Sequence, residues 1–146
     1  MFMTSLAFRI LVHLLPSETI YAHCDVPCGI YDPKPAQIAA ATVLKMTQLL
    51  IELDKPDPTL TEKSKFVRCV VVKEEHAQKC KEELLILWTD YFKPEHLVMF
   101  PNLHDDFWKA TKLCSSTKQE VSIEHAQELI AAVDKIAEMF VNSKKA

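Results

Sequence analysis

The sequence predicts an all-α fold, an antiparallel four-helix bundle preceded by an irregular N-terminal metal-binding hook. Glycine occurs only once in 146 residues, whereas β-sandwiches and glycine-rich phosphate-binding folds need many for turns and close backbone approach. Hydrophobic residues make up 49% of the chain and charged residues 25%, which is typical of one domain with its own core. Beyond residue 33 apolar residues recur at helical spacing, and the short connections favour antiparallel packing.

Composition also argues against several partners and compartments. The formal net charge is −3 at pH 7, so the basic excess typical of nucleic-acid-binding proteins is missing and we expect no nucleic-acid partner. The five cysteines are odd in number and irregularly spaced, which makes a poor disulfide framework and favours a reducing, cytoplasmic location. Cys69, Cys80 and Cys114 fall at helical positions, where we expect small core or surface residues and not metal ligands.

Residues 1–22 differ from the rest of the chain and are predicted to be a removable leader. Their apolar stretch, residues 6–15, is interrupted by Arg9 and His13 and is too short to span a bilayer, so we expect no membrane partner. No Lys or Arg precedes the stretch, which weakens an assignment as a secretory signal peptide. Export and an N-terminal amphipathic helix that stays attached are the alternatives.

Residues 23–33 form the second segment, which we predict to be a shaped, non-helical loop. Both Pro27 and Pro33 and the only glycine, Gly29, fall within these eleven residues. Asp32 is a suitable N-cap and Pro33 suits the first position of a helix. The loop therefore ends where the first bundle helix begins.

Residues 34–146 are predicted to form the four-helix bundle. Thr59 and Glu62 have the spacing of a capping box before the second helix, and Thr117 and Glu120 have the same spacing before the fourth. Pro101 is expected to interrupt the third helix. The predicted helices span about residues 33–53, 59–90 and 94–113, with a fourth that contains residues 126–140.

The side chains of His23, Cys24 and Cys28 lie within six residues and are the candidate metal ligands. Thiolates are soft ligands, and imidazole suits nickel, copper and zinc alike. On the bare pattern, incidental or buried cysteines are an equally good reading. Cleavage before His23 would favour a metal site, because it would free an α-amine on a residue that already carries an imidazole.

That amine, the Cys24 amide nitrogen and the two thiolates could form a planar set of two nitrogens and two sulfurs. Nickel(II) and copper(II) favour this tetragonal arrangement, whereas zinc prefers tetrahedral sites. The imidazole of His23 could add one axial nitrogen and leave the opposite face open.

Residues 23–33, HCDVPCGIYDP, resemble the nickel hook of the nickel superoxide dismutases, whose pattern is HCxxPCGxYDP after a cleaved leader. A second block, residues 87–94 (LWTDYFKP), resembles the end of the second long helix of that family, and Val72-Lys73-Glu74 upstream also fits. The similarity covers residues 23–146. Two specific blocks in the right order make a chance match improbable.

The resemblance implies a superoxide dismutase that converts superoxide to dioxygen and hydrogen peroxide by Ni(III)/Ni(II) cycling, with one nickel ion per subunit. It implies that His23, Cys24 and Cys28 are the metal ligands. Tyr31 would stand over the open face with Tyr91 hydrogen-bonded behind it. The remaining implied site residue is Asp25, which would support the hook, and a cis peptide bond before Pro27 would fold the chain back.

The family's assembly, a homohexamer with hooks packed at subunit contacts, and a protease that removes the leader are further implications. The chain departs from the family at two positions: Ala39 stands where a Glu is frequent, and His76 where an Arg is frequent. Those side chains are thought to orient the axial imidazole, so His76 is a candidate to hold His23 in another way. A non-catalytic nickel-binding protein and a helical interaction module are the competing functions.

Overall fold

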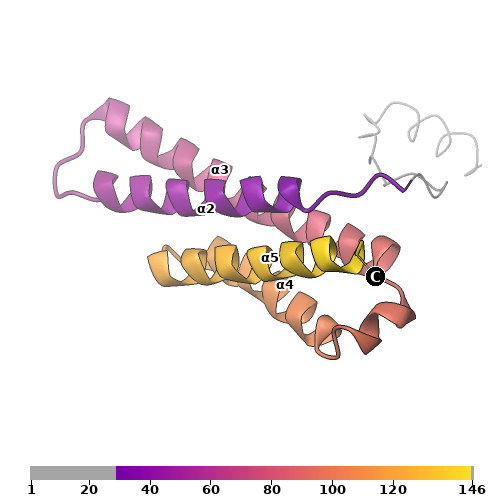
Figure 1. Cartoon of the computed structure of the whole chain (residues 1–146). Coiled ribbons are helices and arrows are strands. Elements are labelled where there is room, and N and C mark those ends of the chain that lie inside the picture. Colours follow the sequence, from indigo (N-terminus) through magenta and orange to yellow (C-terminus); the bar gives the residue numbers. More distant parts are fainter. Residues whose placement is uncertain (1–28, 146) are drawn as a thin grey trace, which may run out of the picture.

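The computed structural model describes residues 29–145, which form four α-helices. In Figure 1 each helix runs antiparallel to the one before it. Helix α2 packs against α3 and α5, and α4 packs against the same two helices. The all-α bundle predicted from the sequence is therefore confirmed. The helices are α2 (Lys34–Leu53), α3 (Leu60–Ile86), α4 (Leu103–Gln119) and α5 (Ile123–Ser143).

One end of the bundle is called the hook end below, because residues 29–33 enter there. The start of α2, the end of α3 and the end of α5 meet at this end, and the α2–α3 turn lies at the opposite end (Figure 1). The core between the ends is built from the apolar stripes of the four helices. Its fully buried members include Val43, Leu84, Phe107, Leu129 and Ile136.

The predicted start of α3 is confirmed in atomic detail. Thr59 is the N-cap, and its Oγ1 accepts a hydrogen bond from the Glu62 backbone N–H at 3.3 Å. The Glu62 carboxylate accepts the Thr59 N–H at 2.9 Å, which completes a reciprocal capping box. Lys55 Nζ lies 2.6 Å from the same carboxylate. At the start of α2, Asp32 Oδ1 accepts the Lys34 N–H at 2.8 Å, although the assigned cap is Pro33.

The capping box predicted at Thr117 and Glu120 is wrong. Thr117 is buried inside α4, its Oγ1 donates to the Cys114 carbonyl at 3.0 Å, and Glu120 is the C-cap of α4. Helix α5 begins later, where Ser122 Oγ accepts the His125 N–H at 3.1 Å. Helix α4 therefore runs beyond the predicted end at residue 113.

The physical reason for this longer helix is a buried lysine. Lys73 is 2% exposed, and its ammonium donates to the carbonyls of Thr117, Lys118 and Glu120 at 2.6, 3.1 and 2.8 Å. Carbonyls in the last turn of a helix have no partner within the helix and carry partial negative charge. One cation from α3 satisfies them, so residues 117–120 end α4 instead of starting α5.

The second predicted helix changes form at its end, whereas the predicted interruption of the third helix near Pro101 is confirmed. The α-helical part of α3 stops at Ile86 and continues as a π-helical turn, Leu87–Tyr91. The predicted third helix is split into a short 3-10 turn, Pro94–Val98, and α4. Proline at residue 94 suits the first turn of the short helix, since its missing N–H is not needed there.

The three cysteines at helical positions are buried in the core. Cys69 is 5% exposed, and Cys80 and Cys114 are fully buried. The thiols of Cys80 and Cys114 hydrogen-bond to each other, and this contact together with burial raises the pKa of Cys80. Cys80 therefore behaves as a small core residue in its thiol form.

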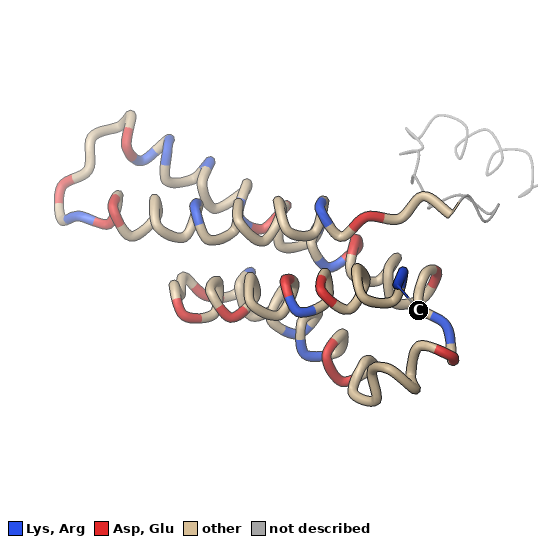
Figure 2. Tube along the Cα trace, viewed as in Figure 1, with Lys and Arg blue, Asp and Glu red and all other residues tan. Residues whose placement is uncertain are grey.

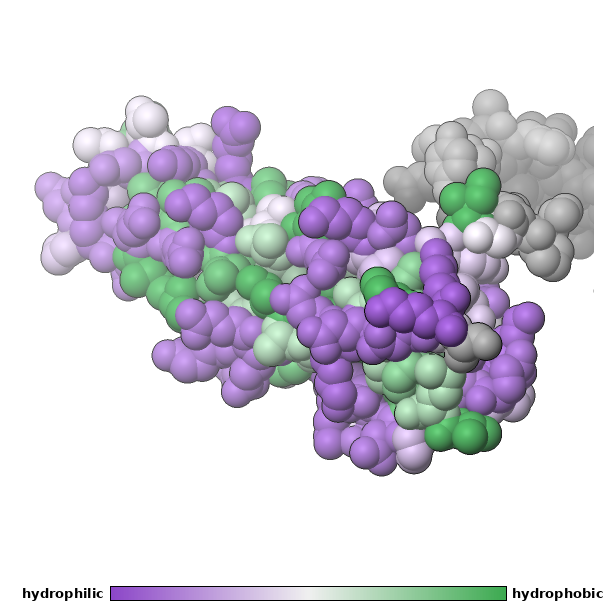
Figure 3. Space-filling model, in the orientation of Figure 1, coloured by the Kyte–Doolittle hydropathy of each residue, from purple (hydrophilic) through white to green (hydrophobic). Residues whose placement is uncertain are grey.

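The bundle surface carries charges of both signs along every helix (Figure 2). The α2–α3 hairpin extends further than the α4–α5 turn (Figure 1), and apolar surface is exposed along it (Figure 3). Its exposed apolar side chains are Ile38, Ile51, Leu60, Phe66, Val67 and Val71. By length and composition α2 is apolar enough to cross a bilayer, but several of its residues are buried within the bundle.

Candidate functional site

The predicted metal ligands His23, Cys24 and Cys28 lie outside the described residues, as do Asp25 and Pro27. Between residues 29 and 145 no group of three or more His, Cys, Asp or Glu side chains is placed to hold a metal ion. The donor set of the hook, two thiols and an imidazole, suits nickel. Its assignment as the metal site stays a prediction from the sequence.

The described end of the hook begins with a turn of the backbone at Gly29. Gly29 has φ +68°, and it is the only positive-φ residue in the described part of the chain. A Cβ on Gly29 would meet no atom within 4 Å. The backbone dihedral, and not crowding, therefore favours glycine directly after Cys28.

The two tyrosines predicted for the site lie together at the hook end. Tyr31 precedes α2, and Tyr91 closes the π-helical turn after α3. Their ring centroids are 5.5 Å apart with an angle of 57° between the planes, within the range of a favourable aromatic pair. The fold thus joins the two sequence blocks that were identified separately.

The π-helical turn explains how the second block positions Tyr91. Leu87 is 2% exposed and anchors the turn in the core. The Phe92 N–H donates to the Leu87 carbonyl at 3.0 Å, which is a spacing of five residues. Trp88 stacks on Phe107 of α4 with 5.7 Å between centroids and 6° between planes. π-Helical turns are rare in proteins overall, and those that do occur are often found at functional sites.

Tyr91 is held by aromatic rings on several sides. Its ring centroid lies 4.5 Å from that of Phe140 in α5, 5.0 Å from Phe92 and 5.8 Å from His96. The His96 ring stacks on Tyr91 at 12° between planes, and its Nδ1 accepts the Lys93 N–H at 3.0 Å. The hydroxyl oxygen of Tyr91 lies 2.7 Å from Ser143 Oγ.

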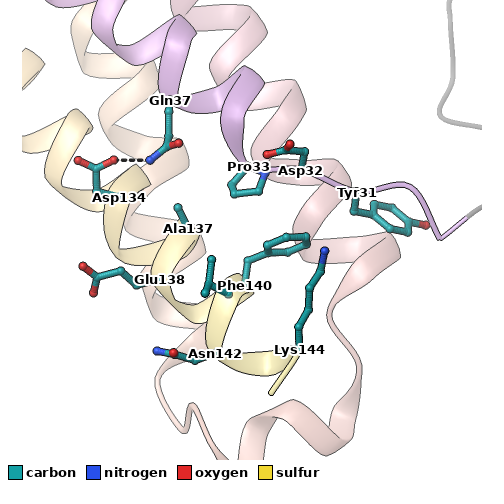
Figure 4. Close-up of a pocket in the computed structure, with 11 residues that line it drawn as sticks. Tyr31, Asp32, Pro33, Gln37, Asp134, Ala137, Glu138, Phe140, Asn142 and Lys144 are labelled. Carbon is teal, nitrogen blue, oxygen red and sulfur yellow. Dashed lines mark hydrogen bonds between the residues drawn. The ribbon is translucent and has the colours of Figure 1, made fainter. Parts of the chain in front are cut away.

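An open cavity of about 590 Å³ adjoins Tyr31 at the hook end. Figure 4 shows its wall: Asp32 and Gln37 from the α2 side, and Asp134, Glu138 and Lys144 from the α5 side. Gln37 Nε2 donates to Asp134 Oδ1 at 2.7 Å and ties α2 to α5. The ammonium of Lys144 lies 4.2 Å from the centroid of the Phe140 ring.

Comparison with known proteins identifies the family. The model of the nickel-containing superoxide dismutases matches residues 18–144. The chain is 37% identical over 134 residues to "Superoxide dismutase [Ni]" of Streptomyces coelicolor, with 90% of this chain and 95% of that protein covered. The corresponding protein of Streptomyces seoulensis is 34% identical over 131 residues, with the same coverage. This chain belongs to the nickel-containing superoxide dismutase family.

Solved structures of the family agree with this assignment. A native nickel superoxide dismutase structure has a TM-score of 0.75 and 33% identity, and covers 85% of this chain and 100% of its own. A structure with nickel ligation corresponding to the oxidized state has a TM-score of 0.74 and 34% identity at the same coverage. This nickel superoxide dismutase is accordingly an oxidoreductase that acts on superoxide, with nickel as its metal.

The two positions at which this nickel superoxide dismutase departs from the family pattern have different environments. Ala39 is 1% exposed and packs in the core, where a methyl group offers no hydrogen bond. His76 is half-buried on α3, and its Nδ1 lies 2.9 Å from the Val72 carbonyl. Because a carbonyl only accepts, Nδ1 must carry the hydrogen, and Nε2 of a neutral ring is left as an acceptor.

Sequence reasoning missed the partners of Tyr91. No pattern in the sequence links Phe140 or His96 to Tyr91. Ser143 carried no signal in the sequence. Phe140 and Ser143 are brought to Tyr91 by the packing of α5, and His96 by the short 3-10 turn that follows Tyr91 in the chain.

Proposed function

We propose that this superoxide dismutase holds one nickel ion per subunit through His23, Cys24 and Cys28, at a hook that becomes competent after cleavage before His23. The chemistry of the donors supports this, because two soft thiolates and an imidazole suit nickel. The absence of another candidate cluster within residues 29–145 also favours the hook. Removal of residues 1–22 would add the free α-amine of His23 to the donors.

The observation that carries the proposal is the contact between Tyr31 and Tyr91, 5.5 Å between ring centroids. Tyr31 belongs to the hook block and Tyr91 to the second block, and each block matched the family independently. Gly29 turns the chain with φ +68° between Cys28 and Tyr31. In the sequence, only two residues separate Cys28, the last proposed ligand, from Tyr31.

Dismutation converts two superoxide ions and two protons into one dioxygen and one hydrogen peroxide. When bound, nickel supplies the one-electron chemistry, alternating between Ni(III) and Ni(II). The chain's own residues order the reactants: Tyr31 would orient water or the incoming anion, and Tyr91 would hold the Tyr31 ring by packing. Asp25 would support the hook from within the loop. Positioning of this kind lowers the barrier without new bonds to the reactants.

His76 is proposed to take over part of the role that Glu and Arg play in relatives. Its Nδ1–H is used by the Val72 carbonyl, so Nε2 is the atom able to accept a hydrogen bond from the His23 imidazole. Ala39 is too short and too buried to share this role.

Maturation, assembly and location complete the proposal. A protease would remove residues 1–22 in the cytoplasm, where the unbridged thiols of Cys69, Cys80 and Cys114 remain reduced.

The protein would form a homohexamer, and the exposed apolar side chains of the α2–α3 hairpin, such as Val67 at 62% and Val71 at 48%, offer contact surface. Sedimentation of the trimmed nickel protein tests the hexamer, and a monomer would contradict it. Cell fractionation tests the location.

The deciding experiment measures bound nickel and superoxide consumption in protein trimmed to His23. We expect Cys28→Ser to lose both, with activity at least about 100-fold lower. Cys69→Ser is the matched control, since it removes a buried thiol of the bundle, and it should keep both. His76→Ala should keep nickel and lower the activity by about tenfold.

Each alternative has its own outcome in this experiment. Nickel bound without superoxide consumption would indicate a non-catalytic nickel-binding protein and overturn the proposed catalysis. Protein that never retains nickel after trimming would indicate a helical interaction module. Full activity in Cys28→Ser would show that the hook thiolate is not a ligand.

A further inference from the structure

Ser143, the last residue of α5, makes two hydrogen bonds whose directions are fixed by chemistry. Its Oγ donates to the Phe140 carbonyl at 2.8 Å and lies 2.7 Å from the hydroxyl oxygen of Tyr91. A serine hydroxyl has a single hydrogen, and a carbonyl oxygen only accepts. The hydrogen of Ser143 is therefore used by Phe140, so Tyr91 must be the donor in the second bond.

This direction limits what Tyr91 can offer at the hook end. A phenol also has only one hydrogen, and that of Tyr91 is donated to Ser143. The oxygen then presents only lone pairs to the rest of the site. We propose that Ser143 is a positioning residue that holds the Tyr91 hydroxyl as a hydrogen-bond acceptor toward the site.

The surroundings keep this orientation in place. Phe140 supplies both the carbonyl that takes the Ser143 hydrogen and a ring whose centroid lies 4.5 Å from that of Tyr91. Phe140 is 4% exposed, and Figure 4 shows it on α5 beside the pocket. The Tyr91 ring also stacks on His96. These ring contacts hold the Tyr91 oxygen beside Ser143, and the hydrogen bond to Ser143 sets the direction of the O–H.

The chemical consequence rests on the proposed function. In the dismutation site, Tyr91 would orient a donor, such as the Tyr31 hydroxyl, a water molecule or the hydrogen peroxide product. It would not give its own proton to superoxide, because that proton is committed to Ser143. The protons of the reaction must then enter through another group, and Tyr91 determines where that donor lies.

The experiment separates the hydrogen bond from the catalytic role. The tyrosine Raman doublet reports whether a phenol donates or accepts, and subtracting the spectrum of the same protein carrying Tyr91→Phe isolates Tyr91 from the other two tyrosines. We expect the signal of Tyr91 to change in Ser143→Ala and to be kept in Ser143→Thr, which preserves the hydroxyl. This readout needs no nickel.

Superoxide consumption by the trimmed nickel protein gives the second readout. Ser143→Ala should lower kcat/KM about fivefold, and Ser143→Thr should lie within about twofold of the unchanged protein. Ser116→Ala is the matched control, because Ser116 Oγ also donates to a carbonyl one turn back, that of Lys112 at 3.3 Å, but it belongs to α4. It should change neither readout.

The outcomes are distinguishable. An unchanged Raman signal in Ser143→Ala would overturn the hydrogen-bond direction. A changed signal with full activity would overturn the positioning role. If the protein without any substitution binds nickel but consumes no superoxide, the proposed function is refuted. The Raman result alone then decides the orientation of the Tyr91 hydroxyl.

Discussion

The two ends of the bundle are built by different kinds of interaction. At the α2–α3 turn, Lys55 and Thr59 both donate hydrogen bonds to Glu62, and the residues joined are at most seven positions apart in the sequence. At the hook end, Tyr91 reaches Ser143 across 52 residues. The turn is thus made by local chemistry that the sequence displays, whereas the hook end exists only once four helices have packed.

Lys73 shows how large a long-range contribution can be, although its contact lies at the α4–α5 turn and not at the hook end (Figure 1). Lys73→Met should lower the free energy of unfolding by about 3 kcal/mol, because three carbonyls at the end of α4 lose their buried partner. Urea denaturation measures the loss. Lys79→Met is the control on the same helix, since Lys79 is exposed, and equal stability of the two variants would refute the role of Lys73.

Stability should be less sensitive to a substitution at the α2–α3 turn. Thr59→Ala removes the hydroxyl of the capping box and should cost about 1 kcal/mol. The site lies at the other end of the bundle (Figure 1), so superoxide consumption should be unchanged. A loss of activity without a loss of stability would mean that the two ends are coupled, against the division drawn above.

The smallest expected effect is the pH dependence contributed by Glu62. The hydrogen bond from Lys55, followed by those from Thr59, lowers the pKa of Glu62 to about 2 from its ordinary value of 4.5. The unfolded chain therefore binds the proton first, so this contribution is complete above pH 4.5 and is lost as the pH falls to about 2. Denaturation at several pH values tests this: Glu62→Gln should lose less stability than the unchanged protein over this window.

The sequence predicted those parts of the molecule that depend on neighbouring residues. The all-α bundle and the capping box at Thr59 followed from periodicity and spacing. The second capping box was wrongly placed at Thr117, because the same spacing occurs inside α4 and only Lys73, from another helix, decides where α4 ends. The spacing of Thr and Glu along the sequence does not reveal that contact.

The site shows the same division. Tyr31 and Tyr91 were selected through resemblance to a family, and the fold brings their rings together. The partners that orient Tyr91 are Phe140, His96 and Ser143, and they come from two further segments. Their residue types are ordinary. Phe140 and Ser143 gain their role from the packing of α5 against the π-helical turn, and His96 from the 3-10 turn that follows it.

The most direct test of the central claim is the intact mass of the protein matured by its native processing machinery with nickel present. We predict a chain that begins at His23, carries one nickel ion and consumes superoxide. An active protein that begins upstream of His23 would contradict the account, because no free amine would then be available at the hook.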